Sequence, residues 1–464
     1  MGLEIPAQFT DPKYRLRRFQ NWMVVGLLYA LFYMSRYNLS TAAPELMKVF
    51  GWTKNDYGIF ETVMPLIYGL SVFFNGPIAD RVGGKKAFLF GAFGVVIMNA
   101  LFGLSHLLVQ SPAVWTAATA TTQATLMQPA QFSHGLTGSS LLTILAIIWG
   151  LNGYFQSFGA LSIVKINAQW FHVRERGTFA AIFGILIRFG LILAFSGVPL
   201  IVKASSWYQA FMIPAILVAI WFVACLLLVK DTPEQAGFPA MDTGDDSGDS
   251  EERVPTMVVL KKVFASSAMW IIGVGSMMIG LVRRSVVDAW WPVYFKEVHH
   301  VGGLSAVYQS TAWGIALAGI GGGFAFGISS DRVYKGRRAP VIVFGFIGMA
   351  LALGFFYLSD VMGLGPWLAA LSLMALSFFV NGTHGMVGGA ATMDFGGRKA
   401  AATAAGLIDG MQYLAASTTG ITVGFITKNY GWGLWKLWPI PFAIFGAVVM
   451  LKLWNVMPGK KGSH

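Results

Sequence analysis

The sequence predicts an all-α membrane protein with twelve transmembrane helices, arranged as two pseudo-symmetric halves of six. Composition is the first reason: 55% of the residues are hydrophobic and 12% are charged, whereas soluble proteins average about 25% charged residues. The second reason is a series of apolar segments long enough to cross a hydrocarbon core of ~30 Å as helices. The third is a short motif that recurs at the same place in each half of the chain.

The apolar segments set the expected order of elements. We expect membrane spans at residues 20–44, 57–78, 87–107, 141–164, 179–201, 207–229, 267–294, 304–329, 340–359, 366–390, 400–427 and 432–456. No cleavage pattern follows the first segment, so we expect it to be retained as a helix. The predicted domains are a cytoplasmic N-terminus (1–19), an N-terminal six-helix half (20–229), a cytoplasmic linker (230–266), a C-terminal six-helix half (267–456) and a cytoplasmic tail (457–464).

The distribution of charge predicts the orientation. Most basic residues fall in short loops, and the positive-inside rule then places both termini in the cytoplasm. The net charge of +12 is not gathered into an arm or stripe, so we expect a lipid bilayer and no nucleic acid as partner. Cys225 is the only cysteine, which excludes intrachain disulfides and cysteine-built metal sites.

Two connections between the predicted spans are unusual. The external segment 108–140 is long and rich in Ala, Thr, Gln and Ser, and we expect a short surface helix or a hairpin there. Residues 231–253 are polar and acidic. Low hydrophobicity and repelling charges predict a flexible loop between the two halves.

Arginines inside the predicted spans are the strongest functional signal. Arg36 lies about 15 residues into the first span, and Arg283 and Arg284 lie at a similar depth in the seventh. A charge at that depth costs about 3 kcal/mol on insertion scales. We hypothesise a central anion site with one arginine from each half. The alternative is that each arginine pairs with a nearby acid or reaches the membrane surface. Asp288, five residues after Arg283, is a poor partner on a regular helical face but not an impossible one.

The repeated motif supports the two-half architecture. Gly76-Pro-Ile-Ala-Asp80-Arg81 follows the second span and Gly327-Ile-Ser-Ser-Asp331-Arg332 follows the eighth. Parallel halves of six spans are the major facilitator arrangement. A further loop motif, Arg174-Glu175-Arg176, follows the fourth span. We interpret these loops as conformational latches that break and reform as the halves move.

Further segments narrow the resemblance. They are Tyr29…Tyr33…Arg36-x-Asn38, Asp231-Thr-Pro-Glu-Gln-Ala-Gly-Phe-Pro239, Arg283-x-x-x-x-Asp288, Tyr294-x-Lys-Glu-Val298 and Lys399-Ala-Ala-Ala-Thr-Ala-Ala-Gly406. In order and spacing they resemble the organophosphate:phosphate antiporter family, which includes bacterial glycerol-3-phosphate and hexose-6-phosphate transporters. The resemblance covers most of the chain except segment 108–140. It implies a bacterial inner (plasma) membrane protein, and we expect a monomer that needs no cofactor or metal.

The resemblance also implies roles for single residues. Arg36 and Arg283 match the two arginines that bind the phosphate group in the family. Pocket tyrosines of the family are matched by Tyr29, Tyr33, Tyr68 and Tyr413. The chemistry agrees, because a guanidinium fork binds phosphate through paired hydrogen bonds and tyrosine hydroxyls add neutral donors. The alternative for each tyrosine is a packing or interfacial aromatic.

The sequence departs from the family at several pocket positions. Val72 replaces a common lysine, and Ile187 stands where many members have a histidine, with Arg188 as its neighbour. Arg284 is an additional cation, and Asn381 occupies the position of a pocket tyrosine. We therefore include Arg188, Arg284 and Asn381 among the candidate substrate-binding residues. These changes favour a more anionic substrate, such as a phosphorylated carboxylate, although Arg188 as a structural arginine remains the alternative.

The expected function is secondary transport by alternating access. The substrate would be an organophosphate (glycerol-3-phosphate-like, a sugar phosphate or a phosphoglycerate), exchanged for inorganic phosphate. One alternative is a sugar-phosphate sensor of the same fold that signals to a membrane kinase. Another is a major facilitator carrier of a different organic anion. The sequence contains no phosphate-binding Gly-rich loop, metal-ligand cluster or nucleophile–base pair that would indicate an enzyme.

Overall fold

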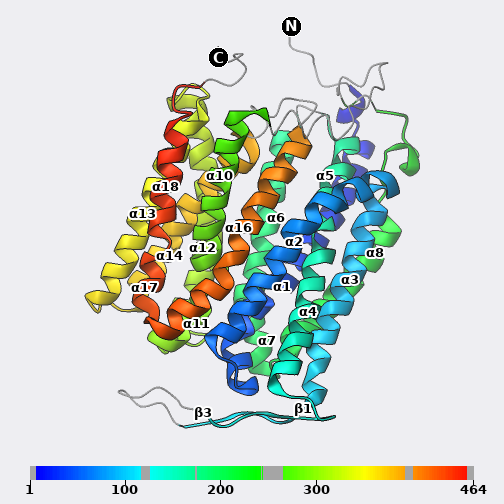
Figure 1. The fold of residues 1–464 in the computed structure, drawn as a ribbon. Helices are drawn as coiled ribbons and strands as arrows, with labels where there is room; N and C mark the ends of the chain where they lie inside the picture. The colour runs from blue at the N-terminus through cyan, green and yellow to red at the C-terminus, as the bar shows by residue number, and fades with distance from the viewer. Residues whose placement is uncertain are drawn as a thin grey trace.

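The predicted fold class is confirmed by the structure, a computed structural model that describes residues 7–116, 126–172, 175–241, 243, 265–391 and 401–456. Long helices run side by side in one bundle (Figure 1). Among the described residues, ten helical segments are long and apolar enough to cross a membrane. α1 (Pro12–Phe50) and α16 (Ala401–Asn429) run through the same bundle and occupy the positions of the first and eleventh predicted spans.

The remaining helices follow the predicted order closely. The N-terminal half continues with α2 (Lys54–Val82), α3 (Gly84–Leu104), α4 (Gly138–Gln156), α5 (Phe158–Trp170), α6 (Arg176–Ile192), η3 (Leu193–Gly197), α7 (Val198–Ala204) and α8 (Gln209–Leu228). The C-terminal half contains α10 (Ser267–Val282), η5 (Arg283–Val287), α11 (Trp291–Val298), α12 (Ala306–Ile328), η6 (Ser329–Val333), α13 (Arg338–Val361), α14 (Pro366–His384), η7 (Gly385–Ala391), α16, α17 (Gly431–Leu437) and α18 (Ile440–Leu451). Short 3₁₀ turns are η1 (Ala7–Thr10), η2 (Ser105–Leu108) and η4 (Glu234–Ala236).

Local sequence explains where the first two long helices begin and end. The carboxylate of Asp11 accepts a hydrogen bond from the Lys13 N–H and caps α1. Gly51 ends α1 with φ 73°, a conformation that glycine adopts without strain. Thr53 and Asp56 then form a reciprocal capping box that starts α2. These signals fix a tight connection between the first two spans.

The described part of the external segment forms a hairpin. β1 (Val109–Ser111) pairs with β4 (Gln131–Phe132), and β2 (Val114–Trp115) pairs with β3 (Leu126–Gln128), both antiparallel. The hairpin lies at the end of the bundle opposite the start of α1 and the end of α18 (Figure 1). We call this the hairpin end. The expectation of a hairpin is met here, whereas a surface helix is not.

The loop motifs make contacts within their own halves. Glu175 accepts two hydrogen bonds from Arg18, at 2.6 and 3.1 Å, and so links the loop before α6 to α1. Asp331 pairs with Arg338 at 2.5 Å, whereas Arg81 is exposed. Tyr14 lies beside Arg18 on α1. Burial raises the pKa of its hydroxyl to about 12, and the neutral hydroxyl donates a hydrogen bond to the Trp170 carbonyl at 2.8 Å.

Several predictions fall outside the described part of the chain. The structure does not describe Arg174, most of the predicted linker, or the side chains of Asp80 and Arg176. Arg332 lies in η6 beside Asp331. The latch role of these loops and the exact domain boundaries therefore stay predictions.

Glycines bring the two halves into close contact at the hairpin end. Gly58 near the start of α2 faces Gly420 on α16, and a Cβ added at Gly420 would lie 2.5 Å from the Thr62 backbone nitrogen. Gly424 similarly approaches the Lys54 carbonyl, where a Cβ would lie at 2.7 Å. Because the neighbouring atoms belong to backbone, a side chain there cannot be accommodated by a rotamer change.

This close packing predicts the effect of a single methyl group. Gly420→Ala should destabilise the protein by about 1–3 kcal/mol through overpacking, which should appear as a lower apparent melting temperature of the detergent-purified protein. Gly323→Ala is the matched control, because a Cβ at Gly323 would meet no atom within 4 Å. Equal melting temperatures for the two variants would contradict the close helix approach.

Candidate anion-binding site

Arg36 occupies the centre of the bundle as a buried cation with neutral partners. Only 1% of it is exposed. Its Nε donates to Gln156 Oε1 at 2.7 Å, and its Nη1 donates to the Tyr413 hydroxyl at 3.1 Å. Its Nη2 is buried without a hydrogen-bond partner. Within the described ranges no carboxylate forms an ion pair with Arg36, so its charge is available to an anion.

Two tyrosine rings enclose the same guanidinium. The Arg36 Cζ lies 4.7 Å from the ring centroids of both Tyr33 and Tyr68, and the Tyr68 and Tyr413 rings lie 4.3 Å apart. Cation–π contacts and neutral hydroxyls stabilise a desolvated cation without cancelling its charge. The ring of Tyr29 packs against the ring of Tyr33, with 5.3 Å between the ring centroids. The structure thus brings three of the four predicted tyrosines into contact with Arg36, whereas Tyr29 packs against Tyr33 and Phe183.

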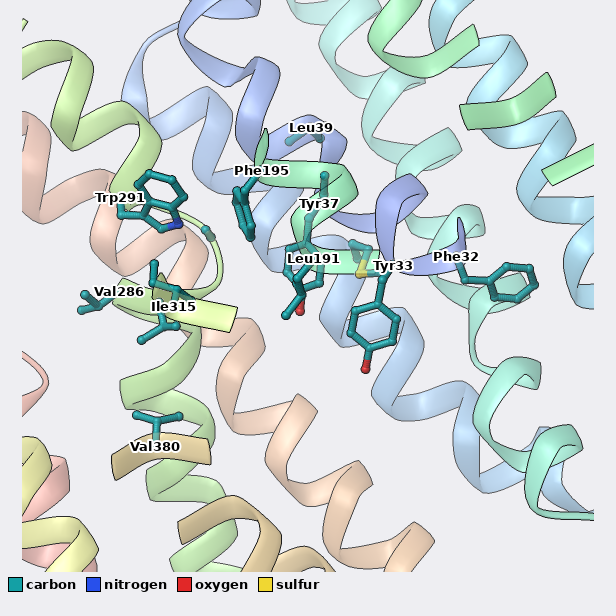
Figure 2. Close-up of a cluster of buried hydrophobic side chains, with 14 of the residues drawn as sticks. Phe32, Tyr33, Tyr37, Leu39, Leu191, Phe195, Val286, Trp291, Ile315 and Val380 are labelled. Carbon is teal, nitrogen blue, oxygen red and sulfur yellow. The ribbon is translucent and has the colours of Figure 1, made fainter. Parts of the chain in front are cut away.

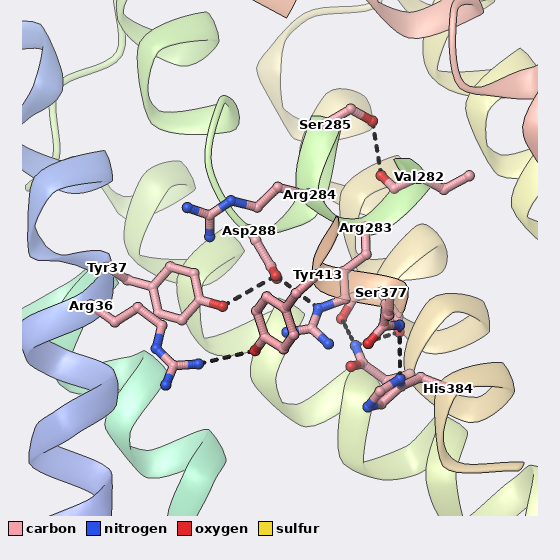
Figure 3. A network of polar contacts seen from close by, with 12 residues as sticks. Arg36, Tyr37, Val282, Arg283, Arg284, Ser285, Asp288, Ser377, His384 and Tyr413 are labelled. Carbon is pink, nitrogen blue, oxygen red and sulfur yellow. Dashed lines mark hydrogen bonds and ion pairs between the residues drawn. The ribbon is translucent and has the colours of Figure 1, made fainter. Parts of the chain in front are cut away.

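Arg283 approaches the same tyrosine from the other half. Figure 3 shows Arg36 and Arg283 on either side of Tyr413, and Arg283 lies close enough to act electrostatically on its hydroxyl. Arg283 Nε pairs with Asp288 Oδ2 at 2.8 Å, and Asp288 also accepts from the Tyr37 hydroxyl at 3.2 Å. Its Nη1 and Nη2 form no hydrogen bond to the described residues, which leaves the terminal face of the guanidinium free.

The pairing of Arg283 with Asp288 is the alternative that the sequence offered for this arginine, through an acid expected to be a poor partner. Five residues separate the two, which disfavours contact on a regular α-helix. Here η5 is a π-turn, in which the Asp288 N–H donates to the Arg283 carbonyl at 3.1 Å. An i→i+5 turn brings residues five apart onto one face, so the acid reaches the arginine.

Arg284 differs from the expectation that it binds substrate. Its guanidinium forms a buried ion pair with Glu61 of α2. Glu61 also accepts from the Ser40 hydroxyl at 2.9 Å and from the Tyr57 hydroxyl at 2.8 Å. The alternative read from the sequence, pairing with an acid, therefore describes Arg284, and its partner comes from the opposite half.

Arg188 and Asn381 meet across the two halves. Arg188, on α6, donates through Nη2 to the Asn381 side-chain oxygen on α14. The Asn381 amide in turn donates to the Ser377 carbonyl and hydroxyl, at 2.8 and 2.9 Å. Arg188 also lies close enough to Arg283 for the two charges to repel. Both predicted residues thus lie beside the central arginines.

A cluster of buried aromatic side chains packs beside the arginines. Figure 2 shows Tyr33, Tyr37, Phe195 and Trp291 within this buried group, which draws on both halves. The ring centroids of Tyr37 and Phe195 are 5.7 Å apart, and those of Phe195 and Trp291 are 5.1 Å apart. Excluding water lowers the local dielectric constant and strengthens the interaction of the arginines with any bound anion.

Three polar residues of the site were not assigned a pocket role from the sequence. Gln156 orients Arg36, Gln412 donates to His384 Nδ1 at 3.0 Å, and Asp409 lies within electrostatic reach of Arg36 and Arg283. Asp409 precedes Tyr413 by four residues, and residues i and i+4 share a helical face. That spacing was the signal by which a sequence reading could have found it. Among the described residues no cluster of three His, Cys, Asp or Glu side chains is arranged to hold a metal.

Comparison with known proteins places this geometry in context. The model of the Major Facilitator Superfamily matches residues 25–420. The chain is 28% identical to the glycerol-3-phosphate transporter of Bacillus subtilis over 98% of this chain and 96% of that protein. It is 25% identical to the membrane sensor protein UhpC of Salmonella typhimurium over 91% of this chain and 88% of that protein. The solved D-xylose–proton symporter superposes with a TM-score of 0.68 at 16% identity, covering 96% of this chain and 99% of that chain.

The paired arginines predict a charge-conserving test. Arg36→Lys and Arg283→Lys keep the positive charge but remove the planar fork. Each should weaken binding of inorganic phosphate about tenfold or more, because hydrogen bonds to charged groups contribute about 1.5–3 kcal/mol. Protection of the purified protein against thermal unfolding, titrated with phosphate, measures the affinity. Arg15→Lys, at an exposed position, is the control; unchanged affinity in both site variants would refute the fork model.

Proposed function

The chain belongs to the Major Facilitator Superfamily, and we propose that it exchanges an organophosphate for inorganic phosphate across a bacterial inner membrane. The observation that carries the proposal is Arg36, a buried guanidinium with no carboxylate partner among the described residues. Arg283 of the opposite half lies beyond Tyr413 (Figure 3). Two guanidinium forks from the two halves match the oxygens of one phosphate group.

The substrate class rests on this chemistry together with the relatives. A phosphate group bound by both arginines is common to inorganic phosphate and every organophosphate, so both would compete for one site. The relative from Bacillus subtilis that matches along almost the whole chain is a glycerol-3-phosphate transporter. Tyr33, Tyr68 and Tyr413 would add hydroxyl donors around the phosphate or the organic part of the substrate.

Contacts between the halves support alternating access. At the hairpin end, Lys54 pairs with Glu297 at 2.8 Å, and the Tyr57 hydroxyl donates to the Ala289 carbonyl at 3.1 Å. The Glu61–Arg284 ion pair lies in the same layer, between the arginine site and the hairpin. Under the positive-inside orientation, with both termini in the cytoplasm, this layer closes the external side. Transport would then require the layer to break while an equivalent closure forms on the other side.

Sensing is the second candidate function. A membrane sensor protein is among the relatives, with 25% identity. A sensor would use the same phosphate-binding arginines but would couple binding to a partner protein, without net movement of substrate. Exchange measured with purified protein alone therefore separates the two.

The direct test is exchange in proteoliposomes. Vesicles containing the purified protein are loaded with labelled phosphate and then diluted into glycerol 3-phosphate, glucose 6-phosphate or unlabelled phosphate. Efflux that requires an external organophosphate or phosphate is expected, because an empty site leaves the arginine charges uncompensated. Binding of organophosphates without efflux would favour the sensor. Absence of both phosphate binding and efflux would favour a carrier of another organic anion.

The buried ion pair gives a second prediction for the transport cycle. Glu61→Gln leaves Arg284 without its acid in a buried layer, a loss that typically costs about 3–5 kcal/mol. The closure at the hairpin end should weaken, so a cysteine placed at Ala42, which is buried there, should react faster with a membrane-impermeant maleimide. Both proteins also carry Cys225→Ser, which removes the only native thiol, so that the maleimide reacts only at position 42.

Asp360→Asn is the matched control for this experiment. Asp360 also forms an ion pair, with Lys436, but both partners belong to the C-terminal half. Its loss should leave the labelling rate at position 42 unchanged. Equal labelling in wild type and Glu61→Gln would show that the pair does not hold the halves together.

A further inference from the structure

Arg188 is a third arginine at the centre of the bundle, and the fold makes room for it. Gly319 on α12 lies directly against its guanidinium: a Cβ added at Gly319 would lie 3.2 Å from Arg188 Cζ and 3.0 Å from the Asn381 amide nitrogen. Arg188 is anchored on α6 of the N-terminal half, whereas Gly319 and Asn381 belong to the C-terminal half. The side chain therefore reaches across the space between the halves.

The partners of Arg188 do not balance its charge. Its one hydrogen bond to a described residue goes to the neutral Asn381 amide. The acid Asp288 is already shared by Arg283 and Tyr37. Arg283 adds repulsion, and the side chain of His384, which contacts Gln412 of α16, supplies no compensating negative charge. A half-buried guanidinium beside a second cation, bound only to an amide, is electrostatically unfavourable until an anion approaches.

The charges around the site are distributed unevenly. Asp409 lies on α16 near Tyr68 of α2, whereas Arg188 lies between α6, α12 and α14. The side of α2 and α16 is therefore acidic and the side of α6 and α12 is basic, with Arg36 and Arg283 between them. A ligand with two anionic groups can satisfy all three arginines only if its second group points toward Arg188.

We propose that Arg188 binds a second anionic group of the substrate, so that the substrate is an organophosphate that also carries a carboxylate or a second phosphate. This inference rests on the proposed phosphate site of Arg36 and Arg283 and names the class of compound that fills it. The free nitrogens of the Arg188 fork give hydrogen bonds to either kind of oxyanion. Asn381 holds the guanidinium in position from the opposite half.

The test uses two ligands with the same three-carbon skeleton. 3-Phosphoglycerate carries a carboxylate where glycerol 3-phosphate carries a hydroxymethyl group. Wild-type protein should bind and exchange 3-phosphoglycerate about ten- to a hundredfold better, the range given by a charged hydrogen-bonded contact. Propane-1,3-diol bisphosphate is the third ligand, and it determines whether the second group is a carboxylate or a phosphate. Binding is measured by competition with labelled phosphate, and exchange in the proteoliposomes described above.

Arg188→Gln should lower the affinity for 3-phosphoglycerate and the bisphosphate more than the affinity for inorganic phosphate or glycerol 3-phosphate, so that the preference is lost. Lys203→Gln removes the same charge from an exposed position on α7 and should leave the preference intact. Gly319→Ala keeps the arginine but displaces its guanidinium, so it should reduce the preference and serves if Arg188→Gln fails to fold. A purely structural role for Arg188 would instead lower binding of all ligands equally.

The outcomes separate this inference from the function on which it rests. If wild-type protein binds glycerol 3-phosphate as well as it binds both doubly anionic ligands, the role of Arg188 is refuted even when exchange occurs. If 3-phosphoglycerate or the bisphosphate binds preferentially and the preference depends on Arg188, the inference holds even when exchange is absent and the protein is a sensor. If neither phosphate nor any of the ligands binds, both are refuted.

Discussion

The main physical constraint on this structure is that Arg36 carries a positive charge while it is buried away from water. A guanidinium buried at the centre of a membrane protein needs its hydrogen bonds satisfied, yet a carboxylate partner would cancel the charge needed to attract an anion. The chain resolves this conflict with neutral groups: Gln156 and Tyr413 accept hydrogen bonds, and the faces of Tyr33 and Tyr68 supply weak negative potential. The cation is thereby held in place and remains electrostatically active.

The other central arginines differ in how fully they are compensated. Arg284 is balanced by Glu61 within a buried pair that joins the halves, and Arg283 is partly balanced by Asp288. Arg188 has only the amide of Asn381. Under the proposed function this gradation separates two roles: the balanced pair Arg284–Glu61 joins the halves, whereas the less balanced arginines bind the anionic ligand. Salt bridges that link the halves also cost energy to break, so they favour one closed conformation over intermediate ones.

Much of the fold was predictable because hydrophobic length is a local property of the sequence. The predicted spans at 57–78 and 366–390 match α2 and the helices α14 and η7 within a few residues. Arg36 was identified because a charge inside an apolar segment is visible without any structure. The pairing of Arg284 with Glu61 was not predictable, since it joins residues far apart in the chain and in opposite halves of the molecule. Asp288 could be named from the sequence as a possible partner of Arg283, but only as a poor one, because no sequence signal marked the π-turn that brings residues five apart onto one helical face.

Exchange, as opposed to one-way transport, follows from the same electrostatics under the proposed function. When the halves close around an empty site, Arg36, Arg188 and Arg283 are brought together in surroundings of low dielectric constant, where their repulsion is strongest. Asp288 and Asp409 offset only part of that charge. A bound phosphate offsets the remainder and accepts hydrogen bonds from both halves, so it stabilises the closed intermediate more than the open ones. The empty protein would then cross the barrier slowly and the loaded protein quickly, which couples the outward movement of one phosphate group to the inward movement of another.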